Sequence, residues 1–115
     1  MISRVLQVNQ LIKRELSRII LREIEFPPGV LATVTRVETT ANLIETRVFM
    51  GVMPEEKTKD VLRILGNNIY DLQQEINRKL EMRPVPKIIF IEEKKTKEAG
   101  RIEEILEDIK NKANN

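Results

Sequence analysis

The chain has 115 residues, of which 41% are hydrophobic, so it can form the core of one ordinary domain but not of two. It contains no cysteine, which excludes disulfides, thiolate metal ligands and thiol catalysis, and no histidine, the commonest general base and metal ligand. With 20 basic and 18 acidic residues the net charge is only +2, so the placement of the charges has to indicate any polyanionic partner.

The first predicted element is an amphipathic helix over roughly residues 3–25. Ser3 precedes it as a possible cap, and Pro27-Pro28-Gly29 ends it. Its apolar positions recur at helical spacing and are Val5, Val8, Ile12, Leu16, Ile19, Ile20 and Ile24. One side of this helix is therefore expected to face the core.

A β-hairpin is predicted next, because residues 30–39 and 43–53 are rich in β-branched and aromatic types and are separated by Thr40-Ala41-Asn42. In the second strand, alternate residues should share a buried face, namely Ile44, Thr46, Val48, Met50 and Val52. The other face carries Glu45, Arg47 and Phe49. Phe49 has two interpretations: it stacks on a base, or the C-terminal helix covers it.

Two helices that meet at a bend are predicted after Pro54-Glu55-Glu56. Gly66-Asn67-Asn68 interrupts a helical pattern, although Gly costs roughly 1 kcal/mol relative to Ala in a helix. The apolar stripe keeps its phase across the interruption through Val61, Leu65, Ile69, Leu72, Ile76 and Leu80. Both helices should therefore lie on the same surface, with the weak residues permitting the bend.

Residues 87–92 predict a third strand after Pro84 and Pro86, which end the second helix of the pair. A short C-terminal helix is indicated by Ile102, Ile105, Leu106 and Ile109. The order helix, strand, strand, bent helix pair, strand, helix predicts an α+β fold with its helices on one sheet face. It is the order of a KH-like RNA-binding domain of type II topology, here expected as a single domain over residues 1–112 with a polar tail at 113–115.

Short stretches along nearly the whole chain also match a known family in order: Arg4-Val5, Arg22-Glu23-Ile24 before Pro27, Val34-Thr35-Arg36-Val37-Glu38, Asn42-Leu43 leading to Val48-Phe49, Leu80-Glu81-Met82-Arg83, Val85-Pro86, Phe90, and Arg101-Ile102. By these stretches the chain resembles the bacterial ribosome-binding factor A family. The resemblance implies a KH-like domain in which a bent helix pair replaces the GXXG loop that grips RNA in other KH domains. It also implies binding to the small ribosomal subunit and a role in late maturation of its RNA.

Candidate RNA contacts can be named from the residues themselves. Arg14, Arg18 and Arg22 stand four apart on the first helix and form one stripe beside its apolar face. Guanidinium groups at this spacing are suited to phosphates. The alternative is a solvated helix face on which Glu15 and Glu23 are the partners of these arginines.

A second candidate set lies on the bent pair and just after it. It mixes guanidinium groups, amides and one aromatic ring, which contact phosphates, base edges and base faces. Its members are Arg63, Asn67, Asn68, Tyr70, Gln74, Arg78 and Arg83. A water-exposed helix has a similar composition, and basic residues around the third strand can instead protect a sheet edge.

Catalysis is not expected, because no histidine is present to activate Ser3 or Ser17 and no Gly-rich phosphate loop or metal-ligand spacing occurs. Glu75 and Lys79, four apart, are interpreted as ordinary helix support.

We expect a cytoplasmic monomer with no metal, cofactor, small-molecule substrate or membrane span. With the resemblance, the prediction is an RNA-binding assembly factor whose partners are the small ribosomal subunit, its precursor and ribosomal RNA. The alternative is a protein interaction module that uses the sheet edge or the C-terminal helix.

Overall fold

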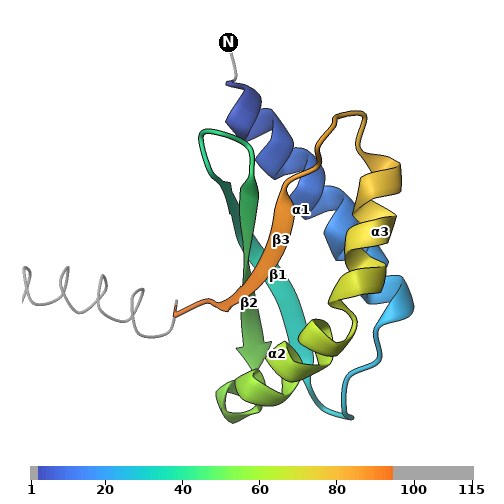
Figure 1. Cartoon of the computed structure of the whole chain (residues 1–115). Coiled ribbons are helices and arrows are strands. Elements are labelled where there is room, and N and C mark those ends of the chain that lie inside the picture. The colour runs from blue at the N-terminus through green and yellow to red at the C-terminus, as the bar shows by residue number, and fades with distance from the viewer. Residues whose placement is uncertain (1–2, 95–115) are drawn as a thin grey trace, which may run out of the picture.

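The computed structural model describes residues 3–94, in which helices cover one face of a three-stranded sheet (Figure 1). In chain order the elements are α1 (Arg4–Glu23), β1 (Leu31–Thr39), β2 (Glu45–Met53), the short 3-10 helix η1 (Glu55–Lys57), α2 (Thr58–Asn67), α3 (Ile69–Lys79) and β3 (Lys87–Glu92). The predicted α+β, KH-like order is confirmed for these elements. The predicted C-terminal helix and the tail at 113–115 lie outside the described residues.

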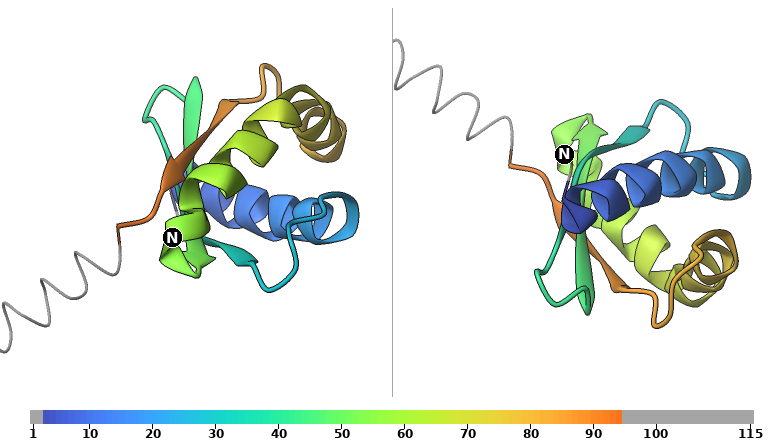
Figure 2. Two further views of the ribbon diagram at one scale, coloured as in Figure 1. Left: turned by 90° about the horizontal axis from the view of Figure 1, so that it is seen from below. Right: turned by 90° about the horizontal axis from the view of Figure 1, so that it is seen from above.

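The sheet has β2 at its centre, with β1 antiparallel and β3 parallel to it. Val34 lies opposite Met50 and Arg36 opposite Phe49, so Thr35 is an extra residue that forms a bulge in β1. Both views in Figure 2 show α1 and α3 on the same side of the sheet. The sheet therefore has a face toward these helices and an outer face that no described helix covers.

Helix α1 begins at the predicted cap, where the Ser3 hydroxyl accepts a hydrogen bond of 3.1 Å from the Leu6 N–H. It ends at Glu23, two residues before the predicted end, because Ile24 has an extended backbone. Five residues at helical spacing are buried against the sheet, namely Val8, Ile12, Leu16, Ile19 and Ile20. The predicted apolar face of this helix is confirmed.

The turn of the hairpin is longer than predicted. The Thr40 hydroxyl accepts hydrogen bonds from the N–H groups of Ile44 (3.3 Å) and Glu45 (3.1 Å), and Leu43 has a φ of 60°. The second strand therefore begins at Glu45, and Ile44 is 63% exposed, so its predicted place on the buried face was wrong. The prediction holds for the strand residues Thr46, Val48 and Met50, which are fully buried.

The bend between α2 and α3 lies at Asn68, where it was predicted. The Asn68 N–H donates to the carbonyls of Ile64 (3.2 Å) and Leu65 (3.1 Å), and its side-chain Nδ2 donates to Ile64 at 2.8 Å. These bonds satisfy carbonyls at the end of α2. The apolar stripe continues through the bend, with Ile69 half-buried and the remaining members buried, namely Val61, Leu65, Leu72, Ile76 and Leu80.

Candidate nucleic-acid interface

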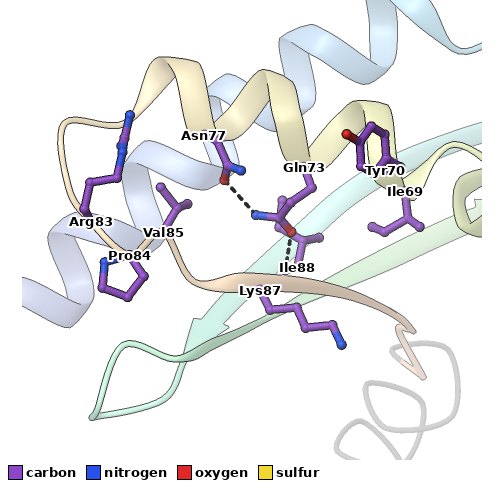
Figure 3. A pocket seen from close by; sticks show the side chains of 9 residues that line it. All are labelled: Ile69, Tyr70, Gln73, Asn77, Arg83, Pro84, Val85, Lys87 and Ile88. Carbon is purple, nitrogen blue, oxygen red and sulfur yellow. Dashed lines mark hydrogen bonds between the residues drawn. The ribbon is translucent and has the colours of Figure 1, made fainter.

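A cleft of about 580 Å³ lies between α3, the loop that follows it and the beginning of β3 (Figure 3). Figure 3 shows Tyr70 and Arg83 near its opposite ends, with Lys87 on the strand. Its walls carry Ile69, Tyr70, Gln73, Asn77, Arg83, Pro84, Val85, Lys87 and Ile88. The cleft thus combines an apolar lining with cationic side chains at its rim.

Gln73 connects the two walls of this cleft. Its Nε2 donates to Asn77 Oδ1 and to the Pro86 carbonyl, both at 3.1 Å, and its Oε1 accepts from the Ile88 N–H at 2.8 Å. Helix α3 is thereby held to the start of β3. Sequence reasoning missed Gln73, because nothing in the local pattern shows that a helical amide will meet a strand 15 residues later.

Two predicted residues lie at this cleft, Tyr70 and Arg83. The Tyr70 side chain is 72% exposed and its ring is open to solvent. Arg83 donates through Nη1 to the carbonyls of Leu80 (3.1 Å) and Met82 (2.5 Å), which hold its guanidinium against the loop. The cleft therefore has an exposed aromatic ring, that of Tyr70, and a guanidinium held in one orientation, that of Arg83.

A second depression, of about 450 Å³, lies on the other side of α3 toward the end of α1. Its lining shares Tyr70 with the first cleft and otherwise consists of Glu23, Asp71, Gln74, Glu75 and Arg78. Arg22 Nη2 lies 2.7 Å from Glu23 Oε2 and 3.0 Å from Glu75 Oε2, and Arg78 pairs with the same Glu75 carboxylate. The depression is therefore polar and contains both signs of charge.

The charge of Glu75 is maintained by its arginine neighbours. A hydrogen bond from Arg78 is the largest cause that holds the pKa of Glu75 below its usual range, and the positive charge of Arg22 acts in the same direction. The pKa of Arg22 is raised, first by its hydrogen bond with Glu23. The Glu75 side chain is 19% exposed, so this ion-pair network is only partly screened by water.

The rest of the arginine stripe on α1 is exposed and paired locally. Arg14 Nε lies 3.3 Å and Arg18 Nη1 3.7 Å from the same Glu15 carboxylate. Glu15 and Glu23 are thus the partners expected if this were a solvated helix face. Exposed pairs of this kind contribute little to stability, so they leave the guanidinium groups open to exchange partners.

The structure separates some of the predicted residues from α3. Arg63 is on α2 and pairs with Asp60 at 3.6 Å, and it lines neither depression. Asn67 is exposed at the end of α2, whereas the Asn68 amide is used in the bend. The predicted residues that come together around α3 are Arg22, Tyr70, Gln74, Arg78 and Arg83.

Glu75 was interpreted from the sequence as a partner of Lys79, and this interpretation was wrong. Its carboxylate instead pairs with Arg78, three residues away, and with Arg22, 53 residues away. Within residues 3–94, no three acidic side chains are grouped so that they could hold a metal ion. Among the helices of residues 3–94, none combines the length and the hydrophobicity that a membrane span requires.

Comparison with known proteins gives one consistent result. The family model for ribosome-binding factor A matches residues 4–106. The chain is 32% identical to ribosome-binding factor A of Akkermansia muciniphila over 103 residues (90% of this chain and 82% of that protein) and 29% identical to that of Bdellovibrio bacteriovorus over 115 residues (97% and 86%).

Solved structures agree in fold. The crystal structure of ribosome-binding factor A from Thermus thermophilus superposes with a TM-score of 0.67 at 23% identity, over 78% of this chain and 97% of that chain. A homology model of the Thermus thermophilus protein, fitted into a cryo-EM map of its complex with the 30S subunit, superposes with a TM-score of 0.58 at 25% identity, over 70% and 86%.

Proposed function

Because this chain belongs to the ribosome-binding factor A family, we propose that it binds the small ribosomal subunit and its precursor through ribosomal RNA and assists late maturation of the subunit. The observation that carries the proposal is the family match over residues 4–106. The similarity to a protein fitted into a 30S complex supports it. The factor acts in the cytoplasm without catalysis, by stabilising one conformation of the immature RNA.

The surface around α3 is the proposed RNA contact. Tyr70 offers an exposed ring for a base, and Arg22, Arg78 and Arg83 offer guanidinium groups for phosphates. Since the amide of Gln73 is already bonded on both its nitrogen and its oxygen, the cleft offers mainly apolar contact. Recognition should therefore depend on RNA shape and phosphate positions more than on base identity.

Carboxylates reduce the positive charge of this surface. Glu75 pairs with Arg22 and Arg78, and Glu15 pairs with Arg14 and Arg18. An RNA phosphate has to replace these carboxylates as the partner of each guanidinium. The exchange costs part of the binding energy, which suits a factor that must leave the subunit after maturation.

The direct test is binding of the full chain to purified small subunits and their precursors at several salt concentrations. With about 4 to 6 phosphate contacts, the logarithm of affinity should fall against the logarithm of salt with a slope of roughly 3 to 5 in magnitude. Equal binding to large subunits would contradict the proposal. Tight binding without salt dependence would favour the alternative, docking to a protein through the sheet edge or the C-terminal segment.

The maturation role needs a separate test in cells. Cells that lack this protein should accumulate precursors of the small-subunit RNA, and the parent chain should restore processing. The matched comparison is the triple variant Arg14→Gln, Arg18→Gln, Arg22→Gln at equal expression. Full rescue by a variant that no longer binds subunits would separate processing from binding and contradict the proposed mechanism.

A further inference from the structure

The outer face of the sheet carries an apolar patch. Residues alternate between the two faces of a strand, and Ile88 is buried on the helix side, as are Val48 and Met50. Their neighbours therefore point outward. The register places Phe49 beside Ile91, and Ile89 lies two residues before Ile91 on the same face, opposite Arg47. We call Phe49, Ile89 and Ile91 the outer patch; all three are half-buried.

The flanks of the outer patch are charged but balanced. The Arg36 guanidinium lies 3.8 Å from the centroid of the Phe49 ring and pairs with Glu38 and with Glu93, the latter at 2.9 Å. Arg47 pairs with Glu45 at 3.1 Å. Because each arginine faces a carboxylate, this face suits an apolar occupant with polar flanks better than a polyanion.

Glu93 places the end of the described chain at this patch. Its N–H donates to the Met50 carbonyl at 2.9 Å, and its carboxylate accepts from Thr35 Oγ1 (3.3 Å) and Arg36 Nε (2.9 Å). The side chain, 10% exposed, thus reaches across β2 to β1. Figure 1 shows β3 ending on the side of the sheet away from α1 and α3. The described chain therefore ends beside the outer patch.

The sequence of residues 95–115 provides a suitable occupant. Ile102, Ile105, Leu106 and Ile109 recur at helical spacing. The positions between them carry the acidic residues Glu103, Glu104, Glu107 and Asp108, which would form the other side of such a helix. The residues from 94 to 101 can extend over roughly 26 Å, several times the strand spacing of about 4.8 Å. The linker is long enough to return over the sheet.

We propose that residues 101–110 of this chain form an amphipathic helix that docks on the outer patch of the same molecule. Its four aliphatic side chains cover Phe49, Ile89 and Ile91, and its acidic side faces water. The outer face is then closed, so RNA and other partners meet the side of the domain that carries α1 and α3.

The absence of cysteine from the chain allows a clean crosslinking test. One double variant joins Ile91→Cys with Leu106→Cys, and its matched control joins Ile91→Cys with Glu104→Cys. The two tail positions have nearly the same reach but lie on opposite sides of the proposed helix. Under mild oxidation the intramolecular disulfide should form about tenfold faster in the first variant.

Equal rates in the two variants would show a tethered segment without docking and would overturn the proposal. Faster disulfide formation between copies than within one would also overturn it and assign the patch to a second molecule. A second measurement avoids changing the patch: Leu106→Asp in the full chain should shift the backbone amide resonances of Phe49, Ile89 and Ile91 but not those around Glu75. Unchanged patch resonances would overturn the proposal.

Discussion

The guanidinium of Arg22 on α1 lies 3.0 Å from the carboxylate of Glu75 on α3, and Arg78 pairs with the same carboxylate. This contact joins the end of the first helix to the middle of the third. It brings the arginine stripe of α1 next to the mixed polar set on α3. The two candidate surfaces that are far apart in the sequence therefore form one continuous surface.

The arginine stripe can be tested by the triple variant Arg14→Gln, Arg18→Gln, Arg22→Gln. All three side chains are exposed and the buried face of α1 is untouched, so the fold should remain intact. Affinity for small subunits should fall, and the salt slope should decrease in magnitude by about 2 to 3. Binding by sedimentation at several salt concentrations measures both.

The control for this variant removes the same number of charges elsewhere, at Arg47, Lys57 and Lys94, each changed to Gln. These residues are exposed and lie away from both depressions of α3. Their replacement should change the salt slope much less. Equal losses in the two triple variants would indicate that only overall charge matters and would remove α1 from the site.

Glu75→Gln is expected to strengthen RNA binding. Removal of the carboxylate leaves Arg22 and Arg78 without this competing partner, so phosphates should bind more tightly and the salt slope should become steeper. Direct comparison of parent and variant in the subunit-binding titration measures this effect. Weaker binding in the variant would contradict the competition model and show that Glu75 holds the arginines in a productive position.

The same variant should change how stability depends on pH. Because the pKa of Glu75 is lowered in the folded state, its contribution to stability is complete above the ordinary glutamate pKa of about 4.3 and is lost as pH falls through the lower folded value. The difference in unfolding free energy between parent and Glu75→Gln should shrink over that interval. Denaturant titrations above and below pH 4.3 test this, and a constant difference would contradict it.

The bend can be removed by changing Gly66, Asn67 and Asn68 to Ala, which raises intrinsic helix propensity by roughly 2 kcal/mol. A Cβ at Gly66 meets no atom within 4 Å beyond its chain neighbours and the backbone of its own helix, but the bond from the Asn68 side chain to the Ile64 carbonyl is lost. The variant should fold with its buried stripe intact. It should bind subunits more weakly, because a straighter helix displaces Tyr70, which lies two residues after the bend and lines both depressions. Thermal unfolding and subunit binding measure the two effects.

Gly66→Ala alone is the matched control for the bend. It gains helix propensity of up to about 1 kcal/mol while Asn68 keeps its contact with Ile64. It should unfold at a higher temperature and bind as the parent does. If the triple variant also binds as tightly as the parent, the bend has no part in RNA recognition.

Two residues of the cleft beside α3 are expected to contribute to RNA binding in different ways. Tyr70→Ala removes an exposed ring, so loss of base stacking should cost about 1–3 kcal/mol of binding free energy without changing the salt slope. Arg83→Gln should instead reduce the slope by about 1. Salt titrations of both variants separate the two roles. A changed slope in Tyr70→Ala, or an unchanged one in Arg83→Gln, would contradict this assignment.

Local sequence patterns were sufficient to predict the order of the described elements, the buried stripe through the bend and the family. These features follow from local properties: a helical period that persists from Val61 to Leu80, and proline and glycine at the ends of elements. The place of the bend was predictable for the same reason, since Asn68 satisfies the carbonyl of Ile64 within one helical turn. The exposure of Ile44 was not, because it depends on the turn formed by Thr40.

Contacts between side chains of different elements could not be predicted from these local patterns. The pair of Arg22 with Glu75 spans 53 residues, and the bond of Gln73 with Ile88 spans 15. Local spacing favoured Lys79 as the partner of Glu75, but packing of α1 beside α3 placed Arg22 within reach. Such contacts depend on how two elements are placed against each other, and that placement is determined by the whole core rather than by the residues that make the contact.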